Sequence, residues 1–351
     1  MTAAVLSPLS LTVILVSFPD GPRRRRAVAT WGVVATAGGA LGVLLSGLLT
    51  AYLDWRWVLF VNVPFVVAAT ALALTAVHDS QAENRVPPDV IGAVFATAST
   101  TLLAFGFVHA GNHVWGTPVT VSAVAGSLVA GMAFVGWELR TSVPLIRLSV
   151  LRIRSVWVAT VLIALIGTAG VSGFYFASLS LQNVLGYDPL STGLAFLPFA
   201  AGTVLATKAS PGLVERFGMR TILMAGFTVG AIGMLCFTRL EMGVGYSTFL
   251  LASIPTSVGL GLCGAPTLSL GTSGVLSQEA GMVSGLLTTS RQVGGGVALA
   301  ALASVASQHA GQGVHALADG YHTAFLLQCL LLFAAAIIAL VYVPRDTGIG
   351  S

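Results

Sequence analysis

Charged side chains inside long apolar stretches are the first features of this sequence that suggest chemistry, and there are very few of them. All 12 Asp and Glu residues fall between the apolar stretches or at their ends. Among the basic residues, only Arg291 lies well inside such a stretch, residues 281–306. An ionisable residue within a membrane span is costly and is therefore a candidate functional residue. Arg291 is accordingly the first candidate functional residue.

The depth of Arg291 depends on where its helix begins. A start at Gly281 places Arg291 about 15 Å along the helix, at a rise of about 1.5 Å per residue. A start near Leu286 lets the guanidinium snorkel to the membrane interface. Snorkelling or bonding between helices is the structural interpretation, and a place at the inner mouth of a substrate path is the functional one.

Polar and aromatic side chains in other apolar stretches are further candidates for contacting a small compound on a path through the membrane. Gln182 and Asn183 either contact the compound or cap the end of their span. Phe174 and Tyr175 either face an apolar cavity or pack against lipid and neighbouring helices. Pro266 lies inside a span, where a kinked or broken helix is able to line a cavity.

Most other chemistries lack the groups that they need. No G-x-x-x-x-G-K-[ST] phosphate cradle occurs, and no paired carboxylates or Ser/His/Asp set lies at one membrane depth. The three cysteines stand singly in apolar stretches, which predicts neither a disulfide framework nor a metal cluster. Residues 259–264 fit G-x-G-x-x-G, but without a preceding strand they predict a face for helix packing. We therefore expect that the protein is not an enzyme and that it binds neither a cofactor nor a metal ion.

Histidines gather at what we expect to be the outer ends of spans and in outer loops. Solvated loop histidines are the simplest interpretation, and a metal or pH-sensing site that includes Asp319 is the alternative. The five residues concerned are His109, His113, His309, His315 and His322.

The composition indicates what class of protein holds these residues. The 351 residues are 56% hydrophobic and only 8% charged, whereas soluble domains carry roughly 25% charged residues. The chain therefore cannot cover a surface that faces water, and alternating strand patterns are absent. The sequence predicts an all-α polytopic membrane protein. Its net charge of +4 does not indicate binding to nucleic acid, because the basic residues lie in short loops.

A helix that crosses about 30 Å of hydrocarbon needs about 20 apolar residues. The sequence predicts about ten such transmembrane helices and a shorter first stretch at about 3–18. Basic residues such as Arg23–Arg26, Arg140–Arg154 and Lys208–Arg220 fall on one side of the predicted spans, and Arg56 and Arg239 fall on the other. This asymmetry predicts a cytoplasmic C-terminus. The ten stretches are 29–52, 57–77, 90–108, 117–137, 156–182, 191–208, 219–238, 246–274, 281–306 and 323–343.

Two parts of the chain resemble each other. Pro8-Leu9-Ser10-Leu11 precedes a helix with Gly38, Gly39 and Gly42, and Pro266-Thr267-Leu268-Ser269-Leu270 precedes a helix with Gly294, Gly295 and Gly296. Such similarity suggests two related halves, which are common in transporters.

Several motifs in order resemble the major facilitator superfamily, and specifically its fourteen-span drug:proton antiporters. They are Leu181-Gln182-Asn183-Val184-Leu185-Gly186-Tyr187 with Gly193-Leu194-Ala195-Phe196-Leu197-Pro198, Trp55-Arg56-Trp57 with Phe60, Asn62 and Pro64, and Ser290-Arg291-Gln292-Val293-Gly294-Gly295. By this resemblance Met1 falls within span four of an N-terminally truncated bundle. The expected units are 1–77, a remnant of the N-terminal helical half; 78–155, a central two-helix hairpin with a cytoplasmic linker; and 156–351, the C-terminal six-helix half.

Conformational-switch candidates follow from the resemblance. The family's antiporter motif appears with Val43 in place of its proline, and its small residues still form a face for close helix contact. The charged turn at Glu215, Arg216 and Arg220 resembles a family motif and implies an ion-pair latch, with simple basic anchoring as its alternative. The antiporter-motif residues are Gly38, Gly42, Ser46 and Gly47.

The resemblance implies a secondary active transporter in the plasma membrane that exports small apolar or cationic compounds by proton antiport. No acidic residue lies in mid-membrane, so the coupling carboxylate is expected upstream of Met1. The lipid bilayer, the substrate and the proton are the expected partners, and the oligomeric state is not indicated. The alternatives are a non-transporting remnant of such a transporter and a membrane protein that depends on a partner.

Overall fold

The computed structural model describes residues 22–76, 89–113, 115–141, 144–241, 243–275, 279–309 and 314–344. The predicted stretch at about 3–18, with the first copy of the repeat, lies outside these residues, as do Arg85 and Arg345. Within the described ranges the chain is helical and contains no strand. The prediction of an all-α membrane bundle is therefore confirmed.

Every one of the ten predicted spans coincides with a helix or a helix pair. Eight segments are long and apolar enough to cross a membrane, and α2 and α12 are as long, at 31 and 30 residues. The helices are α2 (Pro22–Tyr52), α3 (Trp55–Phe60), α4 (Asn62–Ala76), α5 (Val90–Asn112), α6 (Pro118–Glu138), α7 (Arg154–Leu179), α8 (Pro189–Ala195), α9 (Leu197–Phe217), α10 (Met219–Phe237), α11 (Tyr246–Thr272), α12 (Ala280–His309) and α13 (Val314–Tyr342), with short turns of 3₁₀ helix at Val150–Arg152 and π helix at Ser180–Val184.

Three boundaries differ from the prediction by seven residues or more. Helix α2 begins at Pro22 instead of residue 29. Helix α9 continues nine residues beyond Lys208, to Phe217, because the polar residues there are compatible with a helix and Ser210 Oγ donates a hydrogen bond to the carbonyl of Leu262 in α11 (2.8 Å). Helix α13 begins at Val314 instead of residue 323. Polar residues at the ends of these helices thus extend the spans that hydropathy alone had delimited.

Local caps and turns set several helix starts. Asp188 is the N-cap of α8, and its carboxylate accepts a hydrogen bond from the backbone N–H of Ser191 (2.6 Å), which holds the pKa of Asp188 below its usual range. Pro189 follows at the first helical position, where its missing N–H has no effect. Between α9 and α10 a single residue, Gly218, turns the chain with φ +83°, a conformation that favours glycine.

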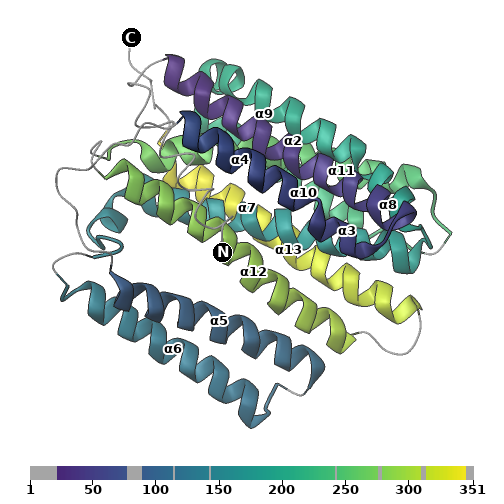
Figure 1. Ribbon diagram of the computed structural model, residues 1–351, viewed down its shortest axis with the longest axis horizontal. Helices are drawn as coiled ribbons and strands as arrows, with labels where there is room; N and C mark the ends of the chain where they lie inside the picture. Colours follow the sequence, from purple (N-terminus) through teal and green to yellow (C-terminus); the bar gives the residue numbers. More distant parts are fainter. Residues whose placement is uncertain are drawn as a thin grey trace.

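Helices α7 and α9–α13 form one bundle with an aromatic core. The core includes Phe176, Phe237, Phe249 and Phe325, which are almost fully buried. The rings of Phe237 and Phe325 stack with centroids 5.0 Å apart and join α10 to α13. Figure 1 shows α7, α10 and α13 in the middle of this group. The C-terminal part of the chain is therefore held by closely packed aromatic side chains.

Glycines let two helix pairs of this bundle approach closely. A Cβ on Gly259 of α11 would meet the backbone of Gly226 and Gly230 of α10 within 2.6 Å. A Cβ on Gly294 of α12 would lie 2.7 Å from the carbonyl oxygen of Ala164 in α7. Small residues serve this purpose in membrane helices generally. The prediction that residues 259–264 form a packing face is confirmed for Gly259 and also for Gly261, which meets Thr203 of α9.

The remaining helices flank the bundle. Helices α5 and α6 form a hairpin held by reciprocal hydrogen bonds between Ser99 and Ser127 (3.0 and 2.8 Å), and α5 packs on α12. In Figure 1 this hairpin lies on the side opposite α2 and α4. Helix α2 packs on α8 and α9, while the apolar segment Trp55–Leu72 buries none of its residues.

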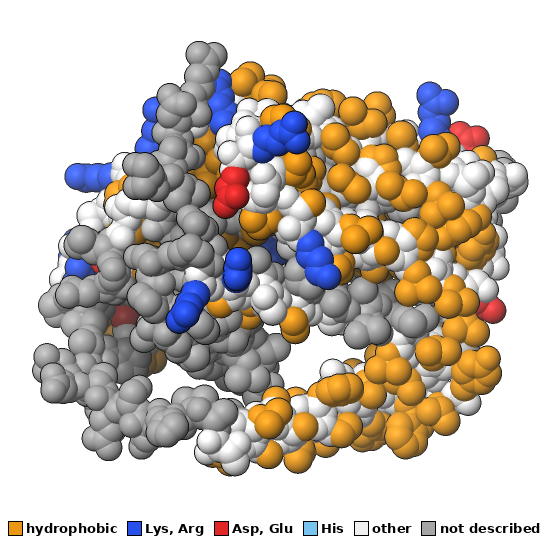
Figure 2. Space-filling view, turned by 90° about the horizontal axis from the view of Figure 1, so that it is seen from above, with side chains coloured by type: hydrophobic (Ala, Val, Ile, Leu, Met, Phe, Trp, Pro, Cys, Tyr) orange, Lys and Arg blue, Asp and Glu red, His pale blue; other side chains and the backbone are white. Residues whose placement is uncertain are grey.

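Basic residues of the described chain concentrate at one end of the molecule. Long helices alternate in direction, so the starts of α2, α5, α7, α10 and α12 share an end with the C-terminus of α13 (Figure 1). We call it the basic end. Figure 2 shows most Lys and Arg side chains toward this end and hydrophobic side chains over much of the remaining surface. The predicted asymmetry is confirmed for the described residues.

Candidate functional site

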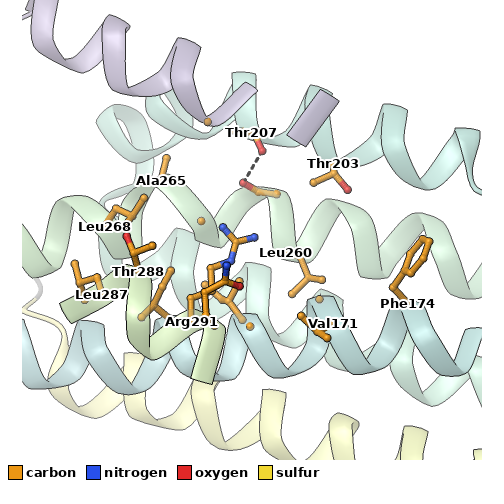
Figure 3. A pocket seen from close by; sticks show the side chains of 18 of the residues that line it. Val171, Phe174, Thr203, Thr207, Leu260, Ala265, Leu268, Leu287, Thr288 and Arg291 are labelled. Atoms are coloured by element: carbon orange, nitrogen blue, oxygen red, sulfur yellow. Dashed lines mark hydrogen bonds between the residues drawn. The ribbon is translucent and has the colours of Figure 1, made fainter. Parts of the chain in front are cut away.

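A cavity of about 630 Å³ lies among helices α2, α7, α9, α11 and α12. Its walls are mainly apolar, and Figure 3 shows Phe174 toward one end of it and Leu268 and Leu287 toward the other. The rings of Phe174 and Phe196 pack with centroids 4.3 Å apart. Cavities of roughly 300–1,000 Å³ with apolar walls and few polar groups are typical small-molecule sites.

Threonine hydroxyls in the cavity wall donate their hydrogen bonds to the backbone. Thr203 Oγ1 donates to the carbonyl of Phe199 (2.9 Å), and Thr288 Oγ1 donates to that of Ser284 (2.9 Å). Thr207 Oγ1 donates across to the carbonyl of Gly261 in α11 (3.3 Å), as the dashed line in Figure 3 shows. These three residues therefore offer a ligand acceptor oxygens and no free donor.

Arg291 is the one charged side chain among the described residues that line the cavity. Helix α12 begins at Ala280, so Arg291 lies about 16 Å along the helix at about 1.5 Å per residue. Of the two placements left open by the sequence, the structure has the deeper one. In Figure 3 the guanidinium points into the cavity, and the described chain gives it no ion pair and no hydrogen bond. Neighbouring Gln292 also lines the cavity.

Gly167 of α7 determines where the backbone of Arg291 lies. A Cβ at Gly167 would overlap the carbonyl oxygen of Arg291, so α7 and α12 touch at this level only because residue 167 has no side chain. Gly295 of α12 meets Val171 of α7 one turn further on. Gly167 was not singled out from the sequence, and Gln292 was included only as part of the motif at residues 290–295. The position of Gln292 directly after Arg291 was the available signal for that residue, whereas Gly167 gave none.

Other predicted path residues lie partly outside the cavity. Phe174 lines it, but Tyr175 is exposed on the outside of α7. Gln182 and Asn183 are exposed in the π turn, where their amides donate to Ser178 Oγ and to the hydroxyl of Tyr321 (both 3.2 Å). Pro266 is buried in α11 and is not a lining residue. Helical periodicity separates these neighbours in sequence onto different faces.

The small residues of α2 also divide into two groups. Gly38 and Gly42 are exposed, and a Cβ on either would meet no described atom within 4 Å. No described residue contacts these two positions, so the expected close helix contact through them stays a prediction. Gly47, in contrast, is buried, and its Cβ would lie 2.9 Å from the carbonyl oxygen of Pro189 in α8. Ser46 is half-buried, so the contact of α2 is displaced toward its C-terminal end.

The predicted charged turn is present, but its ion pair is not. Glu215 and Arg216 are exposed in the last turn of α9, and Arg220 is half-buried in the first turn of α10. Within the described residues no ion pair joins them, and the guanidinium of Arg216 lies over the ring of Phe217 instead (5.1 Å). Adjacent positions point in different directions around a helix, which explains the missing pair.

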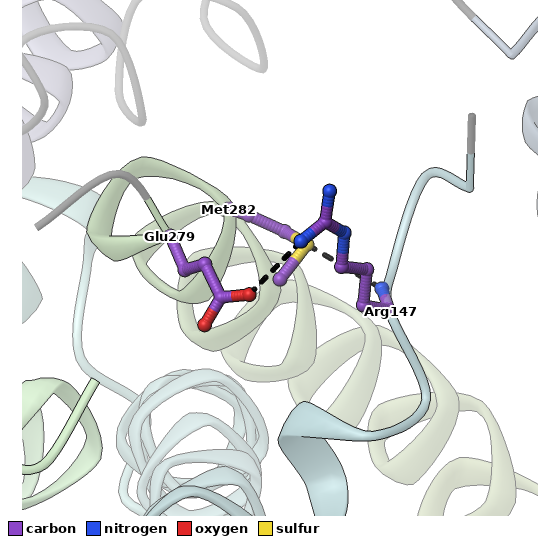
Figure 4. A network of polar contacts seen from close by, with 3 residues as sticks. All are labelled: Arg147, Glu279 and Met282. Carbon is purple, nitrogen blue, oxygen red and sulfur yellow. Dashed lines mark hydrogen bonds and ion pairs between the residues drawn. The ribbon is translucent and has the colours of Figure 1, made fainter. Parts of the chain in front are cut away.

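An ion pair that the sequence did not predict lies at the basic end. Arg147 Nη1 is 3.2 Å from Glu279 Oε1, and the backbone N–H of Arg147 points to the sulfur of Met282 (3.4 Å; Figure 4). The pair joins the segment between α6 and α7 to the start of α12. Arg147 had been assigned only to the basic side, and no local spacing connects it to a residue 132 positions later.

The described histidines contact neighbouring rings, hydroxyls and carbonyls. The rings of His109 and His113 stack with centroids 4.2 Å apart, and His109 Nδ1 lies 3.0 Å from Thr120 Oγ1. His322 lies inside α13, where its Nε2 is 3.1 Å from the carbonyl of Leu240, and not in a loop. The side chains of His309 and His315 are outside the described set. No group of three potential metal ligands occurs among the described residues.

Comparison with known proteins connects this architecture to a family. Residues 1–299 match the family described as the Major Facilitator Superfamily. The chain is 36% identical to the cephamycin export protein CmcT of Amycolatopsis lactamdurans, covering 96% of this chain and 70% of that protein. It is 32% identical to a puromycin resistance protein of Streptomyces alboniger, covering 87% and 61%. It is 29% identical to a tetracenomycin C resistance and export protein of Streptomyces glaucescens, covering 88% and 57%. The chain thus spans less than two thirds of the length of the latter two.

Proposed function

The chain belongs to the Major Facilitator Superfamily, and we propose that this multi-pass membrane protein is a secondary active transporter that exports small, largely apolar compounds. The cavity of about 630 Å³ among five helices is the observation that carries the proposal. Export as the direction is supported by the names of two relatives, which are described as export proteins. Transport, and not catalysis, is the activity proposed for the cavity.

Alternating access is the proposed mechanism. The cavity is lined on one side by Trp31 and Gly32 of α2 and on the others by helices α7, α9, α11 and α12. We take residues 1–77 and 156–351 as two units whose relative rocking opens the cavity to either side, with 78–155 as a hairpin and linker between them. A substrate site at the interface of repeats is common in transporters of this kind.

Proton antiport is the proposed source of energy, and it rests on the resemblance to drug:proton antiporters. Antiport requires a group that takes up and releases a proton during each cycle. The described residues that line the cavity include no Asp or Glu. We therefore expect the group that carries the proton to lie outside this lining. We further propose the plasma membrane as the location, with the basic end and the C-terminus on the cytoplasmic side.

Filling the cavity tests the proposal. Gly264 lines the cavity, and a Cβ there would meet no described atom within 4 Å, so Gly264→Trp places an indole in the cavity without a backbone clash. We expect accumulation of a fluorescent apolar substrate in cells that express this variant to rise to that of cells without the protein. The matched control is Leu251→Trp on the exterior of the same helix, where the side chain is 68% exposed. Equal efflux by both variants at equal protein levels would contradict the proposed site.

A further inference from the structure

We propose that the cavity selects organic anions, meaning compounds with an apolar body and one compact acidic group that binds to Arg291. This inference rests on the proposed export function and specifies its substrate class. It departs from the expectation of cationic substrates, which the sequence alone had left open. Three features of the cavity favour an anion: the charge of its wall, its free hydrogen-bond donors and the distance between its polar and apolar parts.

Charge is the first observation. The described lining includes one cation, Arg291, and no Asp or Glu. The side chain of Arg291 is exposed to the cavity, and a charged group within membrane-spanning helices gains most from a counter-charge. Since the described chain supplies no counter-charge to Arg291, an anionic ligand is the group that completes the site. A cationic ligand would meet like charge in a region of low dielectric.

Hydrogen-bond donors are the second observation. The hydroxyl protons of Thr203, Thr207 and Thr288 are directed to backbone carbonyls, whereas the guanidinium of Arg291 and the amide of Gln292 have no hydrogen-bond partner in the described chain. A guanidinium presents its N–H groups as a planar fork that matches the two oxygens of a carboxylate or sulfonate. The site therefore has donors for an acidic group, whereas it has no acidic acceptor for an ammonium group.

The third observation is the separation between charge and apolar wall. Arg291 packs against Gly167 of α7, and Phe174 follows seven residues later on the same helix, roughly 10 Å along its axis. Figure 3 shows Phe174 toward one end of the cavity, with Val171 and Leu260 between it and Arg291. A ligand that fills the cavity thus has an apolar or aromatic body extending from its acidic group toward Phe174.

A matched pair of fluorescent probes tests the inference in the purified full chain. The two probes, 1-anilinonaphthalene-8-sulfonate and N-phenyl-1-naphthylamine, share an apolar body and differ by the sulfonate. Binding to the protein in lipid nanodiscs is measured by fluorescence after subtraction of empty nanodiscs. We expect tighter binding of the sulfonate, and we expect Arg291→Gln to weaken it about tenfold or more, as loss of a charged hydrogen bond does. Binding of the neutral probe should change less than about twofold.

Control variants separate this effect from a general loss of charge or fold. Arg239→Gln removes an exposed arginine at the opposite end and should change neither probe. If Arg291→Gln binds neither probe, Arg291→Lys is the deciding variant. It keeps the positive charge, so it should still bind the sulfonate more tightly than the neutral probe. Unchanged sulfonate binding in Arg291→Gln, or tighter binding of the neutral probe by the wild type, would overturn the inference.

The same experiment distinguishes this inference from the proposed function. Binding to nanodiscs requires no transport, so an anion preference that depends on Arg291 stands even where proteoliposomes show no transport, and the export proposal then fails alone. Transport of the neutral probe by the wild type, with no effect of Arg291→Gln on either probe, leaves the export proposal intact and removes the anion preference.

Discussion

Helices α11 and α2 are both rich in small residues, yet only one of them uses most of these residues for packing. In α11, Gly259 and Gly261 touch the backbones of α10 and α9. In α2, Gly38 and Gly42 face no described atom within 4 Å, and only Gly47 is buried against a neighbour. The comparison shows that glycine spacing gives a helix the capacity for close contact, while the contact itself depends on which helix lies opposite.

The largest expected effect comes from adding bulk at the tightest contact. Gly259→Val would push a branched side chain into the backbone of Gly226 and Gly230, and overpacking of this kind costs about 1–3 kcal/mol or more. Gly42→Val on the open face of α2 should change stability by no more than about 0.5 kcal/mol. The midpoint of thermal unfolding in detergent measures both variants. A similar loss in Gly42→Val would break the comparison and indicate a partner for that face.

A second contrast lies within the cavity wall. Gly167 and Gly170 are both on α7 and both line the cavity, but a Cβ on Gly167 overlaps the carbonyl of Arg291 while one on Gly170 meets no described atom within 4 Å. Gly167→Ala should therefore displace α12, destabilise the protein by about 1–3 kcal/mol and weaken binding of the anionic probe. Gly170→Ala serves as the matched control. If the two variants unfold and bind alike, Gly167 does not position Arg291.

Periodicity and composition were sufficient to predict the helices but not their partners. The ten spans, the basic end and Arg291 as the intramembrane charge all follow from local sequence, because a membrane demands apolar stretches of defined length. The faces of helices were predicted less well. Tyr175, Gln182, Asn183 and Pro266 lie outside the cavity, since their faces depend on helix packing. Gly167 was not predicted because only its neighbour in α12 makes its missing side chain important.

The charged segments extend the comparison to ion pairs. Glu215 and Arg216 are adjacent in sequence and form no ion pair in the described chain, whereas Arg147 and Glu279 are far apart in sequence and lie 3.2 Å apart. The side chains of Arg147 and Glu279 are 63% and 20% exposed, so this pair should contribute only about 0.2–1 kcal/mol to stability. A double-mutant cycle with Arg147→Gln and Glu279→Gln measures this coupling.

The cycle also has a matched control and a functional measurement. The same cycle on Glu215 and Arg216 should give a coupling energy close to zero. If the Arg147–Glu279 pair acts as a latch between states, its loss should change the transport rate more than it changes stability. Coupling at Glu215–Arg216 as large as that at Arg147–Glu279 would show that the predicted latch forms in solution after all.

The smallest expected effect compares two helix starts. Asp188 accepts the N–H of Ser191 at 2.6 Å in the packed region, whereas Asp54 accepts the N–H of Arg56 at 3.4 Å beside the exposed helix α3. Substitution by Ala should therefore lower the unfolding midpoint more at Asp188 than at Asp54.

Because its pKa is lowered in the folded protein, Asp188 contributes stability above the pKa of the unfolded chain, near pH 4, and loses it as the pH falls further. The difference between the wild type and Asp188→Ala should accordingly shrink below about pH 4. A difference that is independent of pH would mean that the ionised carboxylate is not what stabilises the start of α8.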